Sequence, residues 1–164
     1  MLIARKTIAL CLMLLLLVGN DYGKSHMQTT SNAERISAHL HYVVNQYRAS
    51  KGLVKLSRKS ALDAIAQKHA EDVASGRVPF SHDGFKKRVE AVKGYVKFPY
   101  KAAENLYGIV RPPKVVAPNA LKGWIDSPGH HVNLKGKFLY TGIGVARASN
   151  GEWIVCQFYV GKNA

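Results

Sequence analysis

The chain has few cysteines and few acidic residues. Its 164 residues contain two cysteines, and ten Asp and Glu stand against 24 Lys and Arg. Cys11 lies within an N-terminal apolar run, so a chain without that run would keep only Cys156 and could form no internal disulfide. The hydrophobic core must therefore hold the domain together without cross-links.

Beyond one short run near the N-terminus, the sequence also has no long apolar stretch. Arg5 and Lys6 precede apolar residues 7–19, which are too few for a comfortable membrane span of about 20 residues. This arrangement is typical of an export signal. We therefore predict a signal peptide over 1–19, with an uncleaved anchor as the alternative. A mobile leader over 20–30 and one domain over 31–164 would follow. The expected location is secreted, or periplasmic and in the cell envelope.

The formal net charge of +14 favours polyanionic partners. For an exported protein these would be anionic lipids or acidic envelope polymers, and a solvated basic surface without a specific partner is the alternative. We find no nucleic-acid motif, and the basic residues are spread along the chain rather than gathered with aromatics, so no specific nucleic-acid binding is expected. We expect a monomer.

Helical signals occupy the first part of the domain. Ser31 and Glu34 form a plausible capping box ahead of a helical apolar pattern that ends near Gly52. A second box, Ser60 with Asp63, predicts a helix that ends at Gly76. A weaker helix is expected over 85–92. A fourth helix would carry Leu121 and Trp124 and end at Pro128-Gly129.

The C-terminal part is strand-like. Residues 140–147 and 152–160 flank Asn150-Gly151, which is a strong hairpin signal, and a third strand is expected from about 105 to 110. Helices followed by an antiparallel sheet indicate the α+β class. Cys156 is interpreted as a packed strand residue and not as a nucleophile.

Two histidines and a glutamate are the chemical candidates. His82 precedes Asp83-Gly84, His130 follows Pro128-Gly129, and Glu104 lies between them in the chain. Imidazoles and a carboxylate can bind a divalent metal or move protons. A closed zinc site needs four ligands, so a cation such as Zn²⁺ would be weakly bound with open positions that permit water activation. A hydrogen-bonded polar cleft without metal is the alternative.

Structural roles account for most other candidate residues. Trp124 and Trp153 are expected in the core or cleft wall, and Ser127 and Asn133 should bond backbone around the Pro-Gly turn. His69 should be a core residue, whereas His39, His41 and His131 should lie on the surface. No Ser-His-Asp triad can be assembled, since adjacent Ser81 and His82 point to opposite sides of an extended chain.

In the order and spacing of its motifs, the chain resembles the CAP superfamily, also called SCP-like, which includes cysteine-rich secretory proteins, antigen 5 and plant pathogenesis-related proteins. The small secreted bacterial branch is the most similar. The resemblance covers about residues 35–160 and is carried by the following residues: Val44 to Arg48, Gly52-Leu53, Leu62, Ala66, His69-Ala70, His82, Ala103-Glu104-Asn105, Trp124, Ser127-Pro128-Gly129-His130, Asn133 and Gly142-Ile143-Gly144-Val145.

This resemblance implies a three-layer α/β/α sandwich with a central antiparallel sheet. It also implies a cleft in which His82 and His130 hold a metal in some members, with Glu104 as the acidic residue and Asn105 beside it. Eukaryotic members have a second glutamate before the second histidine; here Asp126 is the only acid near that position.

The leading interpretation is an exported CAP-domain binding or interaction module with a two-histidine cleft. One alternative is a metal-assisted, peptidase-like hydrolase with Glu104 as the base or orienting group. Another is a basic protein that binds lipid or polyanions. Whether the protein is an enzyme stays open, with a binding role favoured.

Overall fold

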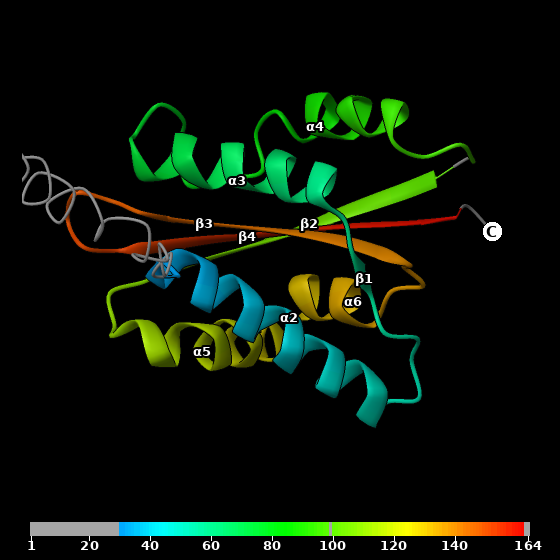
Figure 1. Ribbon diagram of the computed structural model, residues 1–164, viewed down its shortest axis with the longest axis horizontal. Helices are drawn as coiled ribbons and strands as arrows, with labels where there is room; N and C mark the ends of the chain where they lie inside the picture. The colour runs from blue at the N-terminus through cyan, green and yellow to red at the C-terminus, as the bar shows by residue number, and fades with distance from the viewer. Residues whose placement is uncertain (1–29, 99, 163–164) are drawn as a thin grey trace, which may run out of the picture.

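A four-stranded sheet forms the middle layer of the computed structural model, which describes residues 30–98 and 100–162. The strands are β1 (Ser57–Arg58), β2 (Tyr100–Ile109), β3 (Tyr140–Arg147) and β4 (Trp153–Lys162), in the order β1-β3-β4-β2. Helices α3 and α4 cover one face, and α2, α5 and α6 cover the other (Figure 1). The predicted three-layer α+β fold is confirmed. The predicted signal peptide and, except for Thr30, the predicted leader lie outside the described residues.

Helix α2 (Asn32–Ser50) begins as predicted. The Glu34 amide donates to Ser31 Oγ, and the Ser31 amide donates to the Glu34 carboxylate at 2.6 Å, which completes the capping box. The helix buries a stripe formed by Ile36, Leu40 and Val44. This face packs against α5 and the β3–β4 side of the sheet, where it anchors the lower layer.

The second capping box is wrong, although helix α3 (Ser60–Ala74) exists. Its N-cap is Lys59, without a side-chain capping bond. The Asp63 carboxylate instead accepts hydrogen bonds from Arg58 Nε and the Ile143 amide, both at 2.8 Å. Strand β1 is only two residues long, so the next amides of β3 need other acceptors. Gln67 supplies one by accepting from the Val145 amide at 2.9 Å.

Two glycines allow α3 to lie directly on β3. A Cβ at Gly142 would stand 2.1 Å from the Leu62 carbonyl oxygen, and one at Gly144 would stand 2.3 Å from the Ala66 carbonyl oxygen. Any larger residue would push the helix away from the strand. The Gly-Ile-Gly-Val motif therefore sets the contact between the upper layer and the sheet.

Strands β2, β4 and β3 form the predicted antiparallel arrangement. Gly151 has φ +85° at the hairpin, whereas no non-glycine residue of the described chain has a positive φ, so Asn150 does not use that region. Strand β2 is longer than predicted. Strand β1, which pairs in parallel with β3, was not predicted because two residues carry no detectable period.

Pro128-Gly129 does not simply end a helix. Helix α5 (Pro113–Asp126) stops before it, and Pro128 then opens a second helix, α6 (Pro128–Lys135). Proline suits a first helical position because its missing N–H would have no partner there. Helix α4 (Phe85–Ala91) follows the prediction and leads into a short 3-10 helix, η1 (Val92–Gly94). Among the described residues, no helix is long and apolar enough to cross a membrane.

Candidate functional site at the sheet edge

The candidate site lies along β2, which is an edge strand of the sheet. Side chains alternate between the two faces of a strand. Glu104 is bonded to groups from the α3–α4 layer, whereas the next residue, Asn105, is bonded to groups on α6 and β4. Two neighbouring residues of β2 thus form hydrogen bonds with groups on opposite faces of the sheet.

A buried ion pair lies beneath the site. The Glu104 side chain is only 1% exposed, and Arg88 of α4 holds both of its oxygens, through Nε at 2.7 Å and Nη2 at 2.7 Å. Two parallel charge-assisted bonds fix the carboxylate in position and direction. His69 of α3 lies nearby, with Nε2 3.7 Å from the same carboxylate.

His82 is oriented by this carboxylate. Its Nδ1 lies 2.9 Å from Glu104 Oε1, and its side chain is 49% exposed. A carboxylate that already accepts from Arg88 is an acceptor toward His82 as well, so Nδ1 carries the proton. In the neutral ring the lone pair is then on Nε2. Metal-binding histidines commonly have this tautomer when a carboxylate bonds the other ring nitrogen.

His130 approaches from the opposite layer. It is the third residue of α6, and its ring centroid lies 6.3 Å from that of His82. Burial, and then the neighbouring His82, lower the pKa of His130 below its usual value. The ring is therefore neutral at neutral pH and keeps a lone pair for a ligand.

Two asparagines fix the position of α6 against β2. Asn105 Nδ2 donates to the His130 carbonyl oxygen at 3.1 Å, and Asn133 Nδ2 donates to Asn105 Oδ1 at 2.8 Å. Asn133 also donates to the Glu104 carbonyl oxygen, and Trp124 Nε1 donates to the Leu106 carbonyl oxygen at 2.8 Å. These bonds occupy two main-chain acceptors of the edge strand and so discourage pairing with a further strand.

The donor set fits a loosely held metal and not a closed site. His82 and His130 offer two imidazole nitrogens, but both Glu104 oxygens already bond Arg88 or His82. Within residues 30–98 and 100–162, no group of three or more His, Cys, Asp or Glu is placed to hold a metal ion. A metal bound here would take its remaining ligands from water or from a bound molecule.

The structure corrects several sequence-based expectations near the site. Asn133 bonds β2 and not the Pro-Gly turn, and Ser127 caps α6 with no side-chain hydrogen bond. Asp126 is exposed and pairs with Lys122, so it does not replace a second cleft glutamate. His41 is not a plain surface residue, because its Nε2 bonds the Leu56 carbonyl oxygen at 2.9 Å.

Three other expectations hold, and the surface position expected for His131 does not, because this residue is half-buried. Trp124 and Trp153 are buried, and so is Cys156. His69 is a core residue whose Nε2 bonds the Ser81 carbonyl oxygen. His131 points away from the cleft and lies 2.5 Å from the Tyr47 hydroxyl.

Arg88 is the functional residue that sequence reasoning missed. It lies in the same helix as Lys86 and Lys87, and nothing in a single sequence marks it as the partly buried member of this basic run. Only the helical turn directs Arg88 toward Glu104 while the two lysines stay exposed.

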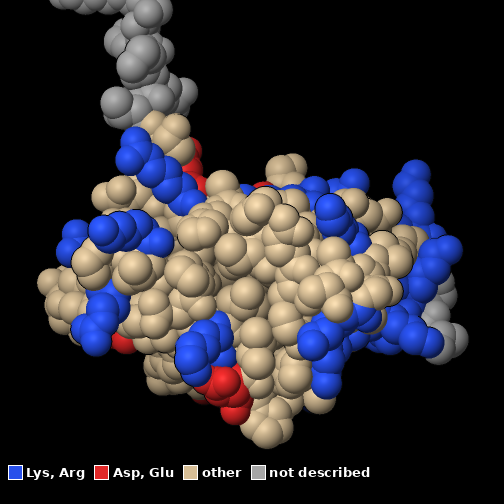
Figure 2. Space-filling view, turned by 90° about the horizontal axis from the view of Figure 1, so that it is seen from below, with Lys and Arg blue, Asp and Glu red and all other residues tan. Residues whose placement is uncertain are grey.

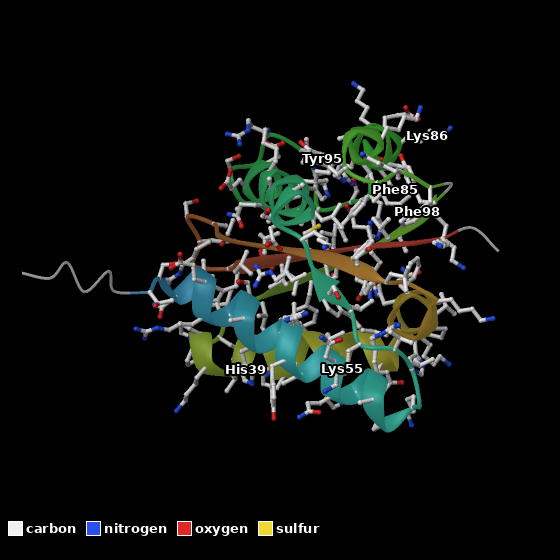
Figure 3. The ribbon with its side chains drawn as sticks, turned by 45° about the vertical axis from the view of Figure 1, so that its right-hand side comes forward. His39, Lys55, Phe85, Lys86, Tyr95 and Phe98 are labelled. Carbon is white, nitrogen blue, oxygen red and sulfur yellow. The ribbon has the colours of Figure 1, made fainter. Side chains whose placement is uncertain are left out.

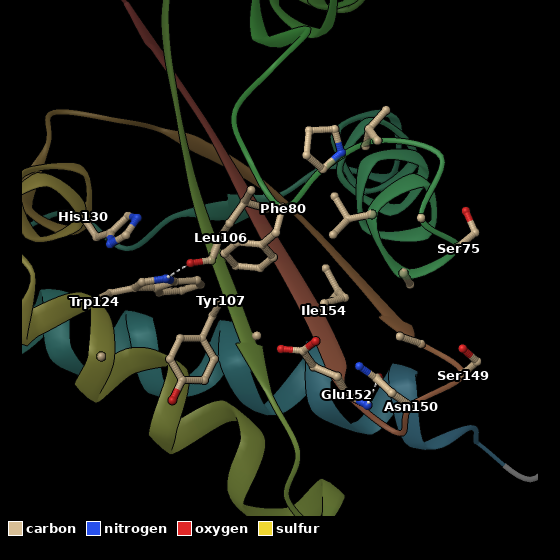
Figure 4. Close-up of a pocket in the computed structure, with 18 of the residues that line it drawn as sticks. Ser75, Phe80, Leu106, Tyr107, Trp124, His130, Ser149, Asn150, Glu152 and Ile154 are labelled. Carbon is tan, nitrogen blue, oxygen red and sulfur yellow. Dashed lines mark hydrogen bonds between the residues drawn. The ribbon is translucent and has the colours of Figure 1, made fainter.

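A groove of about 990 Å³ begins at His130 and runs along β2 toward the β3–β4 hairpin. Figure 4 shows Trp124 and His130 at one end, Glu152 and Asn150 at the other, and Phe80, Leu106 and Tyr107 between them. On its other side, His130 borders a smaller cavity of about 460 Å³ shared with His82 and Glu104. His130 therefore lies between the histidine cleft and a larger groove whose lining includes Phe80, Tyr107 and Trp124.

Comparison with known proteins agrees with this geometry. The cysteine-rich secretory protein family (CAP) matches residues 41–158, which include both histidines and Glu104. The chain therefore belongs to the CAP family. A search of curated proteins gives no match.

Solved structures show the same fold at low sequence identity. An extracellular protein containing an SCP domain from Bacillus anthracis is 24% identical with a TM-score of 0.63, over 79% of this chain and 41% of that protein. An outer surface protein of Borrelia burgdorferi is 16% identical with a TM-score of 0.64, and the match covers 79% of this chain and 95% of that protein. A cysteine-rich secretory protein from Staphylococcus aureus is 21% identical with a TM-score of 0.63, and the match covers 79% of this chain and 40% of that protein. This chain thus spans about two fifths of the Bacillus and Staphylococcus proteins.

Proposed function

We propose that this protein is an exported binding module that holds a ligand at the cleft between His82 and His130, with a divalent cation such as Zn²⁺ as the candidate bridge. The supporting observation is the pairing of two imidazoles from opposite layers at 6.3 Å, one of them oriented by a buried carboxylate. A metal held there would supply a positive centre for an anionic group of a ligand.

Binding is favoured over catalysis by the state of Glu104. Its two oxygens accept two bonds from Arg88 and one from His82. A carboxylate engaged in this way orients His82 but is poorly suited to take a proton from water. Glu104 is therefore a positioning residue in this proposal.

The exported location has two supports. Arg5 and Lys6 followed by the apolar run 7–19 have the form of an export signal. The structural relatives include one protein described as extracellular and one described as an outer surface protein. Fractionation of cells that express the full chain tests this location, and recovery of the intact chain in the cytosol would contradict it.

Zinc titration calorimetry of the wild-type protein tests the cleft. We expect about one zinc per chain near pH 7.5, with binding that weakens as the pH falls through the imidazole range because a protonated ring has no free lone pair. His82→Ala and His130→Ala should each abolish binding, since one imidazole holds zinc poorly. His39→Ala is the matched control, because His39 is exposed on α2 (Figure 3). Zinc binding that survives both cleft substitutions would place the metal elsewhere.

One observation keeps a hydrolase as the second candidate. The His130 ring borders the groove, and its lowered pKa leaves it neutral and able to accept a proton. Zinc-dependent cleavage of an unstructured protein such as casein, lost in His130→Ala and retained in His39→Ala, would favour this function. Zinc binding without any cleavage would favour the binding module.

A further inference from the structure

Segments that are far apart in sequence bring lysines together at one end of the sheet. Across this end, Tyr140 of β3 lies opposite Ser57 of β1 and Val160 of β4, and Lys162 of β4 lies opposite Tyr100 of β2. The loops that lead into these strands arrive at the same end. We call the following lysines the basic end: Lys59, Lys97, Lys101, Lys137 and Lys162.

The basic end is poor in acidic residues, and Asp63, one helical turn from Lys59, is paired with Arg58. Residues 51–62, 91–103, 127–151 and 153–162 contain no Asp or Glu. In the part of the chain that the structure describes, none of the five lysines takes part in an ion pair, whereas Lys68, Lys93 and Lys122 each do. Figure 2 shows Lys and Arg side chains crowding the right-hand end of the molecule with no acidic side chain among them. Like charges gathered at one end of a molecule repel one another, and an anionic partner relieves this repulsion.

Aromatic rings accompany these lysines. Lys59 Nζ lies 4.8 Å from the Tyr140 ring centroid, Lys162 Nζ lies 5.6 Å from that of Phe98, and Lys101 Nζ lies 5.8 Å from that of Phe138. The rings of Phe98 and Tyr140 are themselves 6.4 Å apart. The fold thus gathers basic and aromatic residues that the sequence shows as scattered.

An apolar hollow lies beside the lysines. A cavity of about 400 Å³ is lined by Lys59 and Lys97 together with Leu62, Tyr95, Val96, Phe98 and Tyr140. Tyr95 at its rim is 62% exposed. Figure 3, which turns this end toward the viewer, shows Tyr95 and Phe98 near the upper layer.

We propose that the basic end docks onto a membrane surface that contains anionic phospholipids. Lysines attract the phosphate layer, and exposed aromatic side chains prefer the boundary between headgroups and acyl chains. A soluble polyanion would need the lysines but would gain little from Tyr95 and the apolar hollow. The combination therefore favours a lipid surface over an acidic polymer. This proposal does not depend on a metal in the histidine cleft.

Vesicle sedimentation with the full-length chain tests the proposal. Wild-type protein should bind vesicles of phosphatidylcholine and phosphatidylglycerol more tightly than vesicles of phosphatidylcholine alone, and salt should weaken the difference. The triple variant Lys59→Gln, Lys101→Gln, Lys162→Gln should bind the anionic vesicles about 100-fold more weakly, because each lysine near such a surface contributes about a fivefold gain.

A matched triple variant gives the control. Arg35→Gln, Arg111→Gln, Lys114→Gln removes the same charge from exposed positions at the start of α2 and near the start of α5. Both triple variants keep the N-terminal apolar run, so insertion through that run contributes equally to both. Equal binding by the two triple variants would overturn the proposal.

The Tyr95→Ser variant distinguishes binding to a membrane surface from binding to a soluble anionic polymer. This substitution should weaken binding to anionic vesicles and leave binding to soluble polyphosphate unchanged, because only the vesicle offers an interface for the ring. Vesicle binding that is insensitive to Tyr95→Ser and equalled by polyphosphate binding would overturn the lipid assignment. Thermal denaturation confirms that each variant is folded.

Discussion

Arg88→Met provides a quantitative test of the ion pair under the cleft. The Glu104 side chain is 1% exposed and that of Arg88 is 13% exposed, so water cannot readily replace the lost guanidinium. Methionine retains much of the side-chain volume, but it leaves a buried carboxylate whose remaining close ring partners are His82 at 2.9 Å and His69 at 3.7 Å. Removing one partner of a buried pair costs about 3–5 kcal/mol, and we expect a loss of stability in that range.

The assay is urea denaturation at neutral pH. The double variant Arg88→Met, Glu104→Gln should recover part of the loss, because no charge is then buried without a partner. Lys87→Met is the matched control on the same helix, where an exposed lysine should change the stability by no more than about 0.5 kcal/mol. A loss below about 1 kcal/mol for Arg88→Met, which is typical of an exposed pair, would refute the reasoning. So would a double variant less stable than Arg88→Met alone.

Two further predictions concern stability. Gly144→Ala should lower the stability measured by thermal denaturation by about 1–3 kcal/mol, because the added Cβ would stand 2.3 Å from the Ala66 carbonyl oxygen. Gly129→Ala is the control, because no atom lies within 4 Å of the Cβ that it adds. Equal losses of stability in the two variants would contradict the close contact between α3 and β3. The free energy of unfolding should fall as the pH drops below about 6.5, because burial lowers the pKa values of His69 and His130 and the unfolded chain then binds protons more readily. His69→Gln and His130→Gln should each flatten this pH dependence, and an unchanged slope in both variants would show that other groups cause it.

The α+β class was predictable because its signals are local. Helical periodicity and the Ser31–Glu34 capping box marked α2, and alternation around Asn150-Gly151 marked the β3–β4 hairpin. The family motifs predict His82, Glu104 and His130 in one cleft. Both histidines and the glutamate do border one cavity.

The errors arise where a residue's partner is distant in sequence. The Ser60–Asp63 pattern looks like a capping box, yet Asp63 bonds Arg58 and the amide of Ile143, which is 80 residues away. The Pro-Gly motif predicts a partner for Asn133 in its own turn, but Asn133 on α6 bonds Asn105 on β2. A sequence pattern specifies which bonds a side chain can make, and tertiary packing decides which of them it does make.

By itself, the sequence indicated helices α2 to α5, strands β2 to β4 and the absence of an internal disulfide beyond residue 11, and it singled out His82 and His130 as candidates, but it did not indicate helix α6. Only the tertiary structure distinguished Arg88 from the exposed lysines beside it, because burial depends on the strand that the helix covers. It also gathered dispersed lysines and aromatics at one end of the sheet, because strand pairing brings together residues that lie far apart in the chain.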